Sequence, residues 1–461
     1  MKKIKLTKDT IEGLLDNLLK RSPNNYGQYT EAVDAIVSHV KKDGDAAVFN
    51  YTKQFDGAEI NAGNIRVTPE EIEAAYNEVS EDVLEVIRKA IVNIRTYHEK
   101  QKQYSWFDSQ PNGTILGQKV TPLQSTGVYV PGGKAAYPSS VLMNVIPAKV
   151  AGVEKIVMVT PPGKAAYPSS VLMNILPAKV AGVEEIVMVT PPGKDGKVNP
   201  GTLVAAHEAG ADVVYKVGGA QAVAALAFGT ESIPKVDKIV GPGNIFVALA
   251  KKAVYGYVSI DSIAGPSEIL VIADETANPR YVAADLLSQA EHDELASAIL
   301  VTTSEALADA VSEEVDGFVE VLSRKSILEK SLENYGYILI AEDLNQAVDI
   351  ANEIASEHLE IVTKNPFEVM TQIKNAGAIF LGEYSSEPLG DYFAGPNHVL
   401  PTNGTAKFFS PLSGDDFIKK SSIIYYSRQA LEPVKDDIIK FAESESLTAH
   451  ANSIRVRFEQ Q

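Results

Sequence analysis

A helical segment near residue 290 carries three side chains that could hold a metal ion. Asp285, Gln289 and His292 follow one another at spacings of four and three residues, which places them on one stripe of a helix. Such a stripe presents oxygen and imidazole nitrogen to a single ion, although glutamine is an uncommon zinc ligand and helical histidines are more often structural. The spacing alone leaves a metal site and an ordinary hydrogen-bonded histidine both open.

A second candidate is the adjacent pair Glu357 and His358, which stands where a helical pattern gives way to an apolar strand pattern. A carboxyl and an imidazole held at the end of an element can act as acid and base if burial and neighbours bring their pKa values toward neutrality. A solvated helix terminus would contain the same two residues, so that interpretation also stays open. Further polar candidates follow downstream, namely Asp391, His398, Glu445 and His450.

Glycine-rich segments follow several short apolar runs, at residues 130–133, 217–221, 240–244 and 264–268. At the carboxyl ends of parallel strands such turns line a ligand crevice, and glycine lets the backbone approach a phosphate or a ring closely. Asp261 follows the Gly241 turn by about twenty residues, as in a dinucleotide-binding fingerprint, but Phe246 occupies the third glycine position. Ordinary turns between strand and helix remain the alternative for any single segment.

The composition narrows the chemistry that these residues can do. The chain has 461 residues, no cysteine, seven histidines and a formal net charge of −18. The absence of cysteine excludes disulfides and thiolate sites, so a metal must use imidazole, carboxylate, amide or water. The surplus of acidic residues argues against nucleic acid as a partner. No apolar run is long enough to span a membrane or form the core of a signal peptide, so we expect a cytoplasmic protein without a membrane partner.

The elements that must position these residues alternate between strand and helix. Helical periodicity covers residues 30–102, and short apolar strand patterns alternate with helical patterns from residue 127 to about residue 382. This alternation predicts parallel sheets buried on both faces, in two α/β domains. After Pro396 the chain becomes irregular and ends in polar helices, as in a small terminal domain.

A near-exact repeat interrupts this pattern, since residues 131–160 recur at residues 161–190 with 26 of 30 positions identical by direct comparison. Each copy predicts a loop, a helix and a buried strand, and two copies are too few for a solenoid, so we interpret the repeat as a local tandem duplication. We expect the first copy to keep the native place because it retains the Gly132-Gly133 turn. Pro162 replaces one glycine in the second copy and removes a backbone donor, so we expect residues 161–190 to be extruded.

Taken together, the motifs resemble those of the histidinol dehydrogenase family from about residue 30 to residue 450. The segments that carry the resemblance occur in this order: GVYVPGGKAAYPSSVLMN, VGGAQAVAALAFGT, KIVGPGN, AGPSEILVIAD, DLLSQAEHD, EHLEI, GDYFAGPNHVLPT and SLTAH. The resemblance implies two successive NAD-dependent oxidations of L-histidinol, through L-histidinal to L-histidine, as the final step of histidine biosynthesis. It also implies one Zn²⁺ per site and a homodimer with shared active sites.

The resemblance assigns roles to individual positions. Zinc would be held by Gln289, His292 and Asp391, together with His450 from the second subunit of a domain-swapped dimer. His358 would be the general base for the alcohol, and Glu357 would activate water for the second oxidation. NAD would contact Tyr129, Gln221 and Asn244. The residues expected to contact the substrate are Ser267, Gln289, His292, His358, Asp391, His398, Glu445 and His450.

The family fold implies two Rossmann-like parallel-sheet domains with small N- and C-terminal helical segments. We expect an N-terminal helical arm at 1–29, a first α/β domain at 30–126 and 268–412 with the zinc and acid/base residues, an NAD domain at 127–267, and a small domain at 413–461 that reaches the partner's site. An extra strand within 127–267 would shift the strands beyond it by one place. A catalytically impaired or misfolded family member is therefore one alternative, and a zinc-dependent hydrolase is the other.

Overall fold

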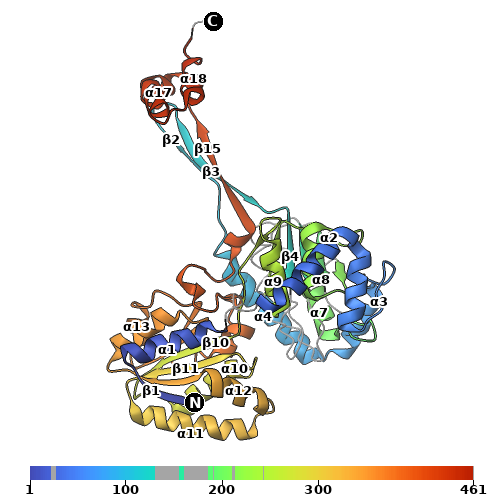
Figure 1. Cartoon of the computed structure of the whole chain (residues 1–461), viewed down its shortest axis with the longest axis vertical. Helices are drawn as coiled ribbons and strands as arrows, with labels where there is room; N and C mark the ends of the chain where they lie inside the picture. Colours follow the sequence, from blue (N-terminus) through green and yellow to red (C-terminus); the bar gives the residue numbers. More distant parts are fainter. Residues whose placement is uncertain are drawn as a thin grey trace. The chain divides into compact units, whose positions relative to one another are not determined.

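Two large parallel sheets carry most of the chain. The computed structural model describes residues 1–21, 27–129, 155–159, 185–189, 192–209, 213–241 and 243–459. The chain divides into a first unit, residues 1–102 and 122–417, and a second unit, residues 103–121 and 418–461. Both large sheets belong to the first unit (Figure 1). Within the described residues, no helix combines the length and the apolar character needed to cross a bilayer.

The first sheet has six parallel strands in the order β1-β12-β11-β10-β13-β14. Every residue of its four central strands is buried, which agrees with their mostly apolar sequences and with a sheet covered on both faces. The strands are β1 (Lys2–Lys5), β10 (Glu268–Ala273), β11 (Ser297–Thr302), β12 (Gly336–Ile340), β13 (His358–Val362) and β14 (Ala378–Leu381).

Helices cover both faces of this sheet, because successive side chains of a strand point to opposite sides. Ile269 and Val271 pack in the core beneath α10, α11 and α12, whereas Leu270 and Ile272 pack in the core beneath α1 and α13 (Figure 1). The helices are α1 (Lys8–Leu19), α10 (Pro279–Ala290), α11 (Glu305–Val321), α12 (Lys325–Tyr335), α13 (Leu344–Ile354), α14 (Pro366–Met370) and α15 (Glu387–Tyr392).

The second sheet also has six parallel strands, in the order β7-β6-β5-β4-β8-β9. Its strands are β4 (Ser125–Tyr129), β5 (Lys155–Val159), β6 (Glu185–Val189), β7 (Val213–Tyr215), β8 (Lys238–Val240) and β9 (Ser259–Ile260). The accompanying helices are α2 (Gly27–Asp56), α3 (Pro69–Glu78), α4 (Glu81–Glu99), α7 (Pro200–Ala209), α8 (Gly219–Phe228) and α9 (Ile245–Val254). The predicted α/β fold with parallel sheets is therefore confirmed.

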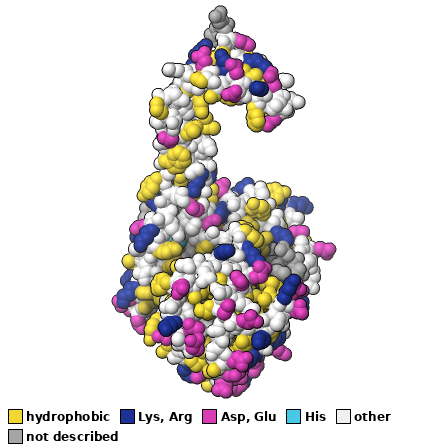
Figure 2. All heavy atoms as spheres, turned by 90° about the vertical axis from the view of Figure 1, so that its left-hand side faces the viewer, with side chains coloured by type: hydrophobic (Ala, Val, Ile, Leu, Met, Phe, Trp, Pro, Cys, Tyr) yellow, Lys and Arg dark blue, Asp and Glu magenta, His cyan; other side chains and the backbone are white. Residues whose placement is uncertain are grey.

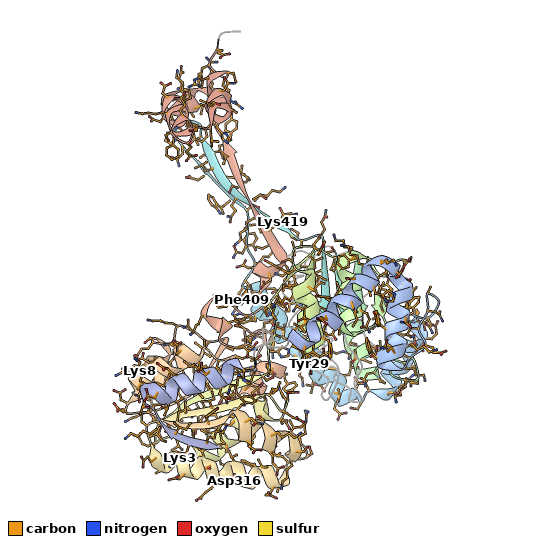
Figure 3. All side chains as sticks on the ribbon, in the orientation of Figure 1. Lys3, Lys8, Tyr29, Asp316, Phe409 and Lys419 are labelled. Carbon is orange, nitrogen blue, oxygen red and sulfur yellow. The ribbon has the colours of Figure 1, made fainter. Side chains whose placement is uncertain are left out.

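The N-terminal helices pack differently from the expected domain grouping. The long helix α2 shares a hydrophobic core with α8 and α9, and α3 packs against α7. Tyr29 of α2 meets the ring of Phe246 on α9 edge-on, with 5.4 Å between the ring centroids (Figure 3 labels Tyr29). These helices belong with the second sheet rather than with residues 268–412. The N-terminal arm also contains strand β1, which pairs with β12 and so extends the first sheet.

Both copies of the repeated strand lie inside the second sheet. β5 pairs with β4 on one side and with β6 on the other, and β6 continues to β7. The copies align residue for residue, with Val157 opposite Val187 and Met158 opposite Met188. The expectation that residues 161–190 are extruded is wrong for this strand, because insertion pairs its backbone groups on both sides whereas extrusion leaves them unpaired. The other residues of the two copies, 131–154, 160–184 and 190, lie outside the described residues.

Any shift caused by an added strand would be confined to one edge. Among the described strands of this sheet, β7 alone lies beyond β6, whereas β8 and β9 lie on the opposite side of β4. The expectation that every strand after the insertion moves by one place is therefore wrong. A strand that enters on one side of β4 displaces its neighbours on that side only.

The second unit is a three-stranded sheet with terminal helices. Its strands are β2 (Trp106–Ser109), β3 (Ile115–Pro122) and β15 (Ile418–Tyr425), in the order β15-β3-β2, and its helices are α16 (Arg428–Leu431), α17 (Lys435–Ser444) and α18 (Thr448–Arg455). The predicted terminal helices are confirmed, but residues 103–121 join this unit instead of the first α/β domain. Several large apolar side chains are exposed on it, including Trp106, Phe107, Ile424, Tyr425 and Phe441 (Figure 2).

Candidate active site

The adjacent Glu357 and His358 lie at the start of β13, where α13 ends. Ala355 adopts the left-handed conformation, with φ of 53°, and so turns the chain from helix into strand. The Nδ1 atom of His358 lies 3.0 Å from the carbonyl oxygen of Glu268, and the Glu357 Oε2 atom accepts a hydrogen bond of 3.0 Å from the Glu268 N–H. Because a carbonyl can only accept, Nδ1 carries the proton and Nε2 is the basic nitrogen of His358.

Burial and neighbouring carboxylates set the charge of this pair. Burial raises the pKa of Glu357, and the Glu268 and Asp391 carboxylates add to this effect against the opposing influence of His358, so that the pKa reaches about 8. Burial alone lowers the pKa of His358, but Glu357, Asp391 and Glu387 outweigh it and raise this pKa to about 10. A cation bound at Asp391 would oppose this effect and lower the pKa of His358 toward neutrality.

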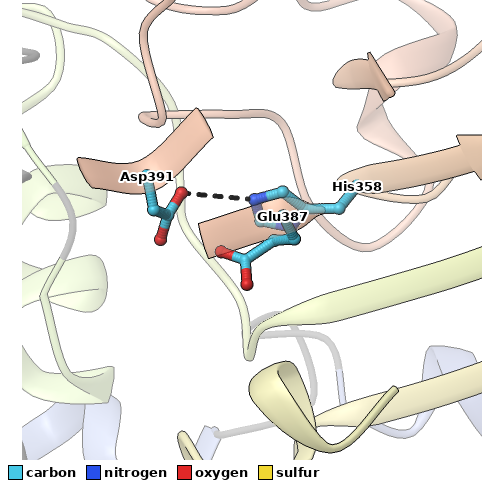
Figure 4. A group of neighbouring side chains, drawn as sticks. All are labelled: His358, Glu387 and Asp391. Atoms are coloured by element: carbon cyan, nitrogen blue, oxygen red, sulfur yellow. Dashed lines mark ion pairs between the residues drawn. The ribbon is translucent and has the colours of Figure 1, made fainter. Parts of the chain in front are cut away.

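Asp391 lies on the short helix α15 and faces two imidazoles. Its Oδ1 atom is 3.6 Å from His358 Nε2 (Figure 4) and 3.4 Å from His398 Nδ1. Burial alone would raise the pKa of Asp391, but His398 and His358 hold it well below its usual range. His358, Glu387 and Asp391 place ligand atoms within 4.8 Å of one another, which is a geometry that a metal ion can occupy.

The predicted helical stripe is interrupted in the structure. α10 ends at Ala290, and His292 lies in the following turn, where its N–H bonds to the Gln289 carbonyl at 3.1 Å. The Asp285 side chain faces Glu360, and burial raises the pKa of Asp285 to about 6, against a smaller lowering by the hydrogen bond to Glu360. Asp285 is therefore paired with the buried Glu360 carboxyl, whereas His292 lies near Asp391 and His358.

The donor set fits a zinc ion. Gln289 is completely buried, and within the part of the chain that the structure describes neither its amide oxygen nor its nitrogen has a hydrogen-bond partner. Burial lowers the pKa of His292 to about 4, against the opposing effect of Asp391, so this imidazole is neutral at pH 7. Its Nδ1 atom lies 3.1 Å from Ser267 Oγ. A neutral imidazole, an ionised carboxylate and an unsatisfied amide are in the states that metal ligation requires.

The expected NAD residues lie around the carboxyl end of β4. Tyr129 is fully buried, and its phenol oxygen has no hydrogen-bond partner among the described residues, nor does Gln221 Oε1. A Cβ atom on Gly243 would lie 3.0 Å from the Tyr129 ring, and one on Gly241 would lie 1.8 Å from the Tyr129 carbonyl oxygen. Asn244 caps α9 by accepting from the N–H groups of residues 246 and 247 at 3.1 and 3.2 Å. The glycines thus bring β4 against a helix N-terminus, where phosphates bind readily.

Asp261 does not have the role that a dinucleotide fingerprint would give it. Its Oδ2 atom accepts a hydrogen bond of 2.6 Å from the Gly241 N–H, and its other oxygen forms an ion pair with the buried Lys251. Lys251 also donates to the Gly241 carbonyl at 3.0 Å. Asp261 and Lys251 therefore fix the conformation of the glycine turn, and Asp261 is already engaged where a ribose-binding acid would have to be available.

Two expected residues lie in the second unit. Glu445 follows α17 and His450 lies on α18, and both are exposed. The sequence reasoning missed Glu387 and Glu268, although both contact the acid/base and metal candidates. The spacing of Glu387 four residues before Asp391 was the available signal for the former. No local pattern indicated Glu268, because its N–H and its carbonyl, not its side chain, contact Glu357 and His358.

Comparisons with known proteins identify the family of the chain. A sequence profile of the family described as histidinol dehydrogenase matches residues 19–164 and 161–458. The chain is 56% identical to a histidinol dehydrogenase of Caldanaerobacter subterraneus subsp. tengcongensis, over 98% of both chains, and 55% identical to one of Clostridium acetobutylicum, over 97% of this chain and 96% of the relative. The crystal structure of histidinol dehydrogenase from Elizabethkingia anophelis superposes with a TM-score of 0.87 at 36% identity, over 99% of this chain and 98% of that one. The chain therefore belongs to the histidinol dehydrogenase family.

Proposed function

We propose that this chain oxidises L-histidinol to L-histidine in two successive NAD-dependent steps, with L-histidinal as the intermediate. The observation that carries the proposal is the proximity of Glu357, His358 and His292 to Asp391, at the start of β13 and the ends of α10 and α15. This arrangement places an acid/base pair beside a set of metal ligands. Oxidation of an alcohol needs both groups, one to accept a proton and one to orient the hydroxyl.

We infer that one Zn²⁺ is held by Gln289, His292 and Asp391, together with His450 from the second subunit of a homodimer. When bound, zinc supplies a Lewis acid that fixes the amino and hydroxyl groups of histidinol. Ser267 lies beside His292 and His398 lies beside Asp391, so both fit the role of substrate-contacting residues. Glu445 would complete the substrate site from the second subunit.

In the first oxidation, His358 Nε2 accepts the hydroxyl proton of histidinol while the carbinol carbon transfers its hydride to the nicotinamide. The hydrogen bond from Nδ1 to the Glu268 carbonyl keeps the ring in the tautomer that leaves Nε2 free to accept. In the second oxidation, Glu357 accepts a proton from the water that attacks the aldehyde, and the resulting hydrate gives the second hydride. Its raised pKa makes Glu357 a stronger base than an ordinary carboxylate.

We propose that NAD binds across the carboxyl end of the second sheet and contacts Tyr129, Gln221 and Asn244. The unsatisfied polar atoms of Tyr129 and Gln221 are suited to hydrogen bonds with the cofactor. Burial raises the pKa of the Tyr129 phenol well above its usual range, and the nearby backbone of Gly219 opposes this effect. This puts the N-terminus of α8 next to that of α9 in the proposed cofactor site.

We infer that residues 161–190 are a second copy of a unit that the family has once. The family profile matches in two pieces that overlap at residues 161–164, where the second copy begins. The alternative of an impaired family member is not favoured, because the catalytic candidates come together in the first sheet and the insertion adds a strand to the second. The exposed apolar side chains of the second unit support a homodimer, since soluble monomers seldom expose such surfaces.

The direct test is an assay of the purified full-length chain with histidinol and NAD. We expect two NADH per histidinol, loss of activity on prolonged chelation, and recovery when zinc is added. Activity with histidinal should need the same metal and cofactor. A chain that hydrolyses esters or amides without reducing NAD would support the zinc hydrolase instead and overturn the proposal.

A further inference from the structure

The first unit contains a fully buried ion pair behind the acid/base residues. Arg21, which follows α1, is completely buried, and its guanidinium pairs with the Glu268 carboxylate, which is 4% exposed as a residue. Arg21 also donates to the carbonyl of Leu295 at 2.9 Å and to that of Leu18 at 3.4 Å. The second carboxylate oxygen of Glu268 accepts a hydrogen bond of 3.2 Å from the Asn403 N–H. Both charges are thus paired and hydrogen-bonded, as a buried pair requires.

The backbone of Glu268 holds both members of the acid/base pair. Its N–H donates to Glu357 Oε2, and its carbonyl accepts from His358 Nδ1, each at 3.0 Å. Ser267, the preceding residue, lies against His292. One short segment at the start of β10 therefore touches the general base, the water-activating carboxylate and a proposed zinc ligand.

On the β13 side, the sheet secures this segment only from the Glu268 carbonyl onward. The ladder between β10 and β13 begins at Ile269 opposite His358, one residue after Glu268. On that side, the Glu268 N–H lies before the ladder and donates to the Glu357 carboxylate, whereas the Glu268 carbonyl lies at the first rung and also faces His358 Nδ1. The Glu268 side chain points to the face of the sheet that α1 covers, where Arg21 and Asn403 hold it.

We propose that Arg21 and Glu268 are positioning residues for the acid/base pair. The ion pair anchors the start of β10 to the N-terminal arm and keeps the Glu268 N–H and carbonyl aligned on Glu357 and His358. The inference rests on the proposed function of that pair. It gives the N-terminal arm a positioning role in catalysis. Among the described residues, Arg21 contacts no group proposed to touch the substrate, so it acts through Glu268.

The main test is the double variant Arg21→Met with Glu268→Met in the full-length, zinc-loaded enzyme. Replacing both charges by apolar side chains of similar length avoids a buried unpaired ion and is often neutral for stability. We expect kcat to fall roughly tenfold or more in both half-reactions, because small misplacements of catalytic groups are costly. KM for histidinol and for NAD should stay within about twofold, and the zinc content should not change. The conservative variant Arg21→Lys keeps the charge and should retain most of the activity.

A matched control is the ion pair between Lys216 and Glu71, with 2.6 Å between Nζ and Oε1. Lys216 is 5% exposed, and neither residue is a site candidate. The control double variant Lys216→Met with Glu71→Gln should keep its kcat even where it loses stability. An equal fall in kcat in the two double variants would show a general structural effect and overturn the inference.

The outcomes separate this inference from the proposed function. A wild-type chain that does not reduce NAD with histidinol removes the proposed function and the inference with it. An active wild type with full kcat in the Arg21/Glu268 double variant overturns the inference alone. If the double variant does not fold, Glu268→Asp decides, because its shorter side chain cannot reach Arg21 and Asn403 at once. A lower kcat with unchanged KM values in Glu268→Asp supports the anchor, and an unchanged kcat rejects it.

Discussion

Glu357 and His358 are neighbours in the chain, but the proposed function gives them different chemical roles. His358 can accept a proton at Nε2 because Nδ1 donates to the Glu268 carbonyl. Burial raises the pKa of the Glu357 carboxyl group to about 8. The two roles can be tested separately because water takes part in the second oxidation only.

We expect Glu357→Gln to slow the oxidation of histidinal by about 10²-fold or more and to slow the first hydride transfer much less. His358→Asn should impair the alcohol step as well, because that step needs a base at Nε2. Single-turnover measurements starting from histidinol and from histidinal separate the two half-reactions. Equal losses in both half-reactions for both variants would contradict the assignment.

Metal retention should follow the protonation of His292. Burial lowers the pKa of this imidazole to about 4, below the ordinary value of 6.5, so the ring remains a neutral ligand as the pH falls through 6 and is protonated only near pH 4. We expect bound zinc, measured by metal analysis after dialysis, to be constant from pH 7 down to that region and then to be lost. Release of zinc already near pH 6.5 would show that protonation of His292 does not set the pH at which zinc is lost. His292→Ala should lack tightly bound zinc at every pH.

At the scale of elements, the α4 helix buries a second histidine that lies outside the site. His98 is completely buried and its Nδ1 atom lies 2.8 Å from Gln101 Oε1. Burial lowers its pKa to about 4, against a smaller raising effect of the Gln101 hydrogen bond. The folded chain therefore holds this ring neutral, whereas the unfolded chain protonates it near pH 6.5.

The free energy of unfolding should consequently fall as the pH drops from 6.5 to 4, because the unfolded state binds the extra proton. One pKa unit corresponds to about 1.4 kcal/mol, so this histidine accounts for roughly 3 kcal/mol across that window. Urea unfolding at several pH values should show a weaker pH dependence for His98→Leu than for the wild type. Identical pH dependence in the two proteins would show that His98 is not the group responsible.

The repeated strand gives a second test at this scale. With β6 inside the sheet, deletion of residues 161–190 removes a paired strand and allows β7 to pair with β5, whose sequence is nearly the same. We expect the deletion variant to fold, with KM for NAD within about twofold of the wild type, because β4, β8 and β9 are untouched. Thermal unfolding and NAD titration provide the measurements. A large gain in both melting temperature and NAD affinity would mean that the extra copy disturbs the domain rather than extending its sheet.

At the scale of the whole molecule, the proposed site needs two subunits. Gln289, His292 and Asp391 lie in the first unit, whereas His450 and Glu445 lie in the second. If the second unit of one subunit completes the site of the other, inactive variants can complement each other.

Mixing His292→Ala with His450→Ala subunits after reversible dissociation should restore activity. Random exchange makes about half of the dimers heterodimers, and each heterodimer has one site with four intact ligands, so about a quarter of wild-type activity is expected. Each variant subjected to the same treatment alone is the control. Verified heterodimers without activity would rule out a shared site.

The sequence by itself determined the central strands of the first sheet and named the residues expected to do the chemistry. Short, mostly apolar runs predicted β10, β11, β12 and β13, and the change of periodicity at residues 357 and 358 placed the acid/base pair at a helix-to-strand junction, as found. These features can be predicted from the local sequence, because hydrophobic periodicity indicates which face of a helix or strand is apolar.

Tertiary structure alone decided which faces and backbone groups meet. α2 could have covered either sheet, Asp261 could have been available to a ligand, and residues 185–189 could have lain outside the sheet. Packing of α2 on α8 and α9, the Lys251 ion pair and the pairing of β6 on both edges settled these points. The anchoring of Glu268 by Arg21 joins residues 247 positions apart. Such contacts form because buried charges and buried backbone groups need a partner, and that partner can lie far away in the sequence. A local sequence pattern does not show which residue it is.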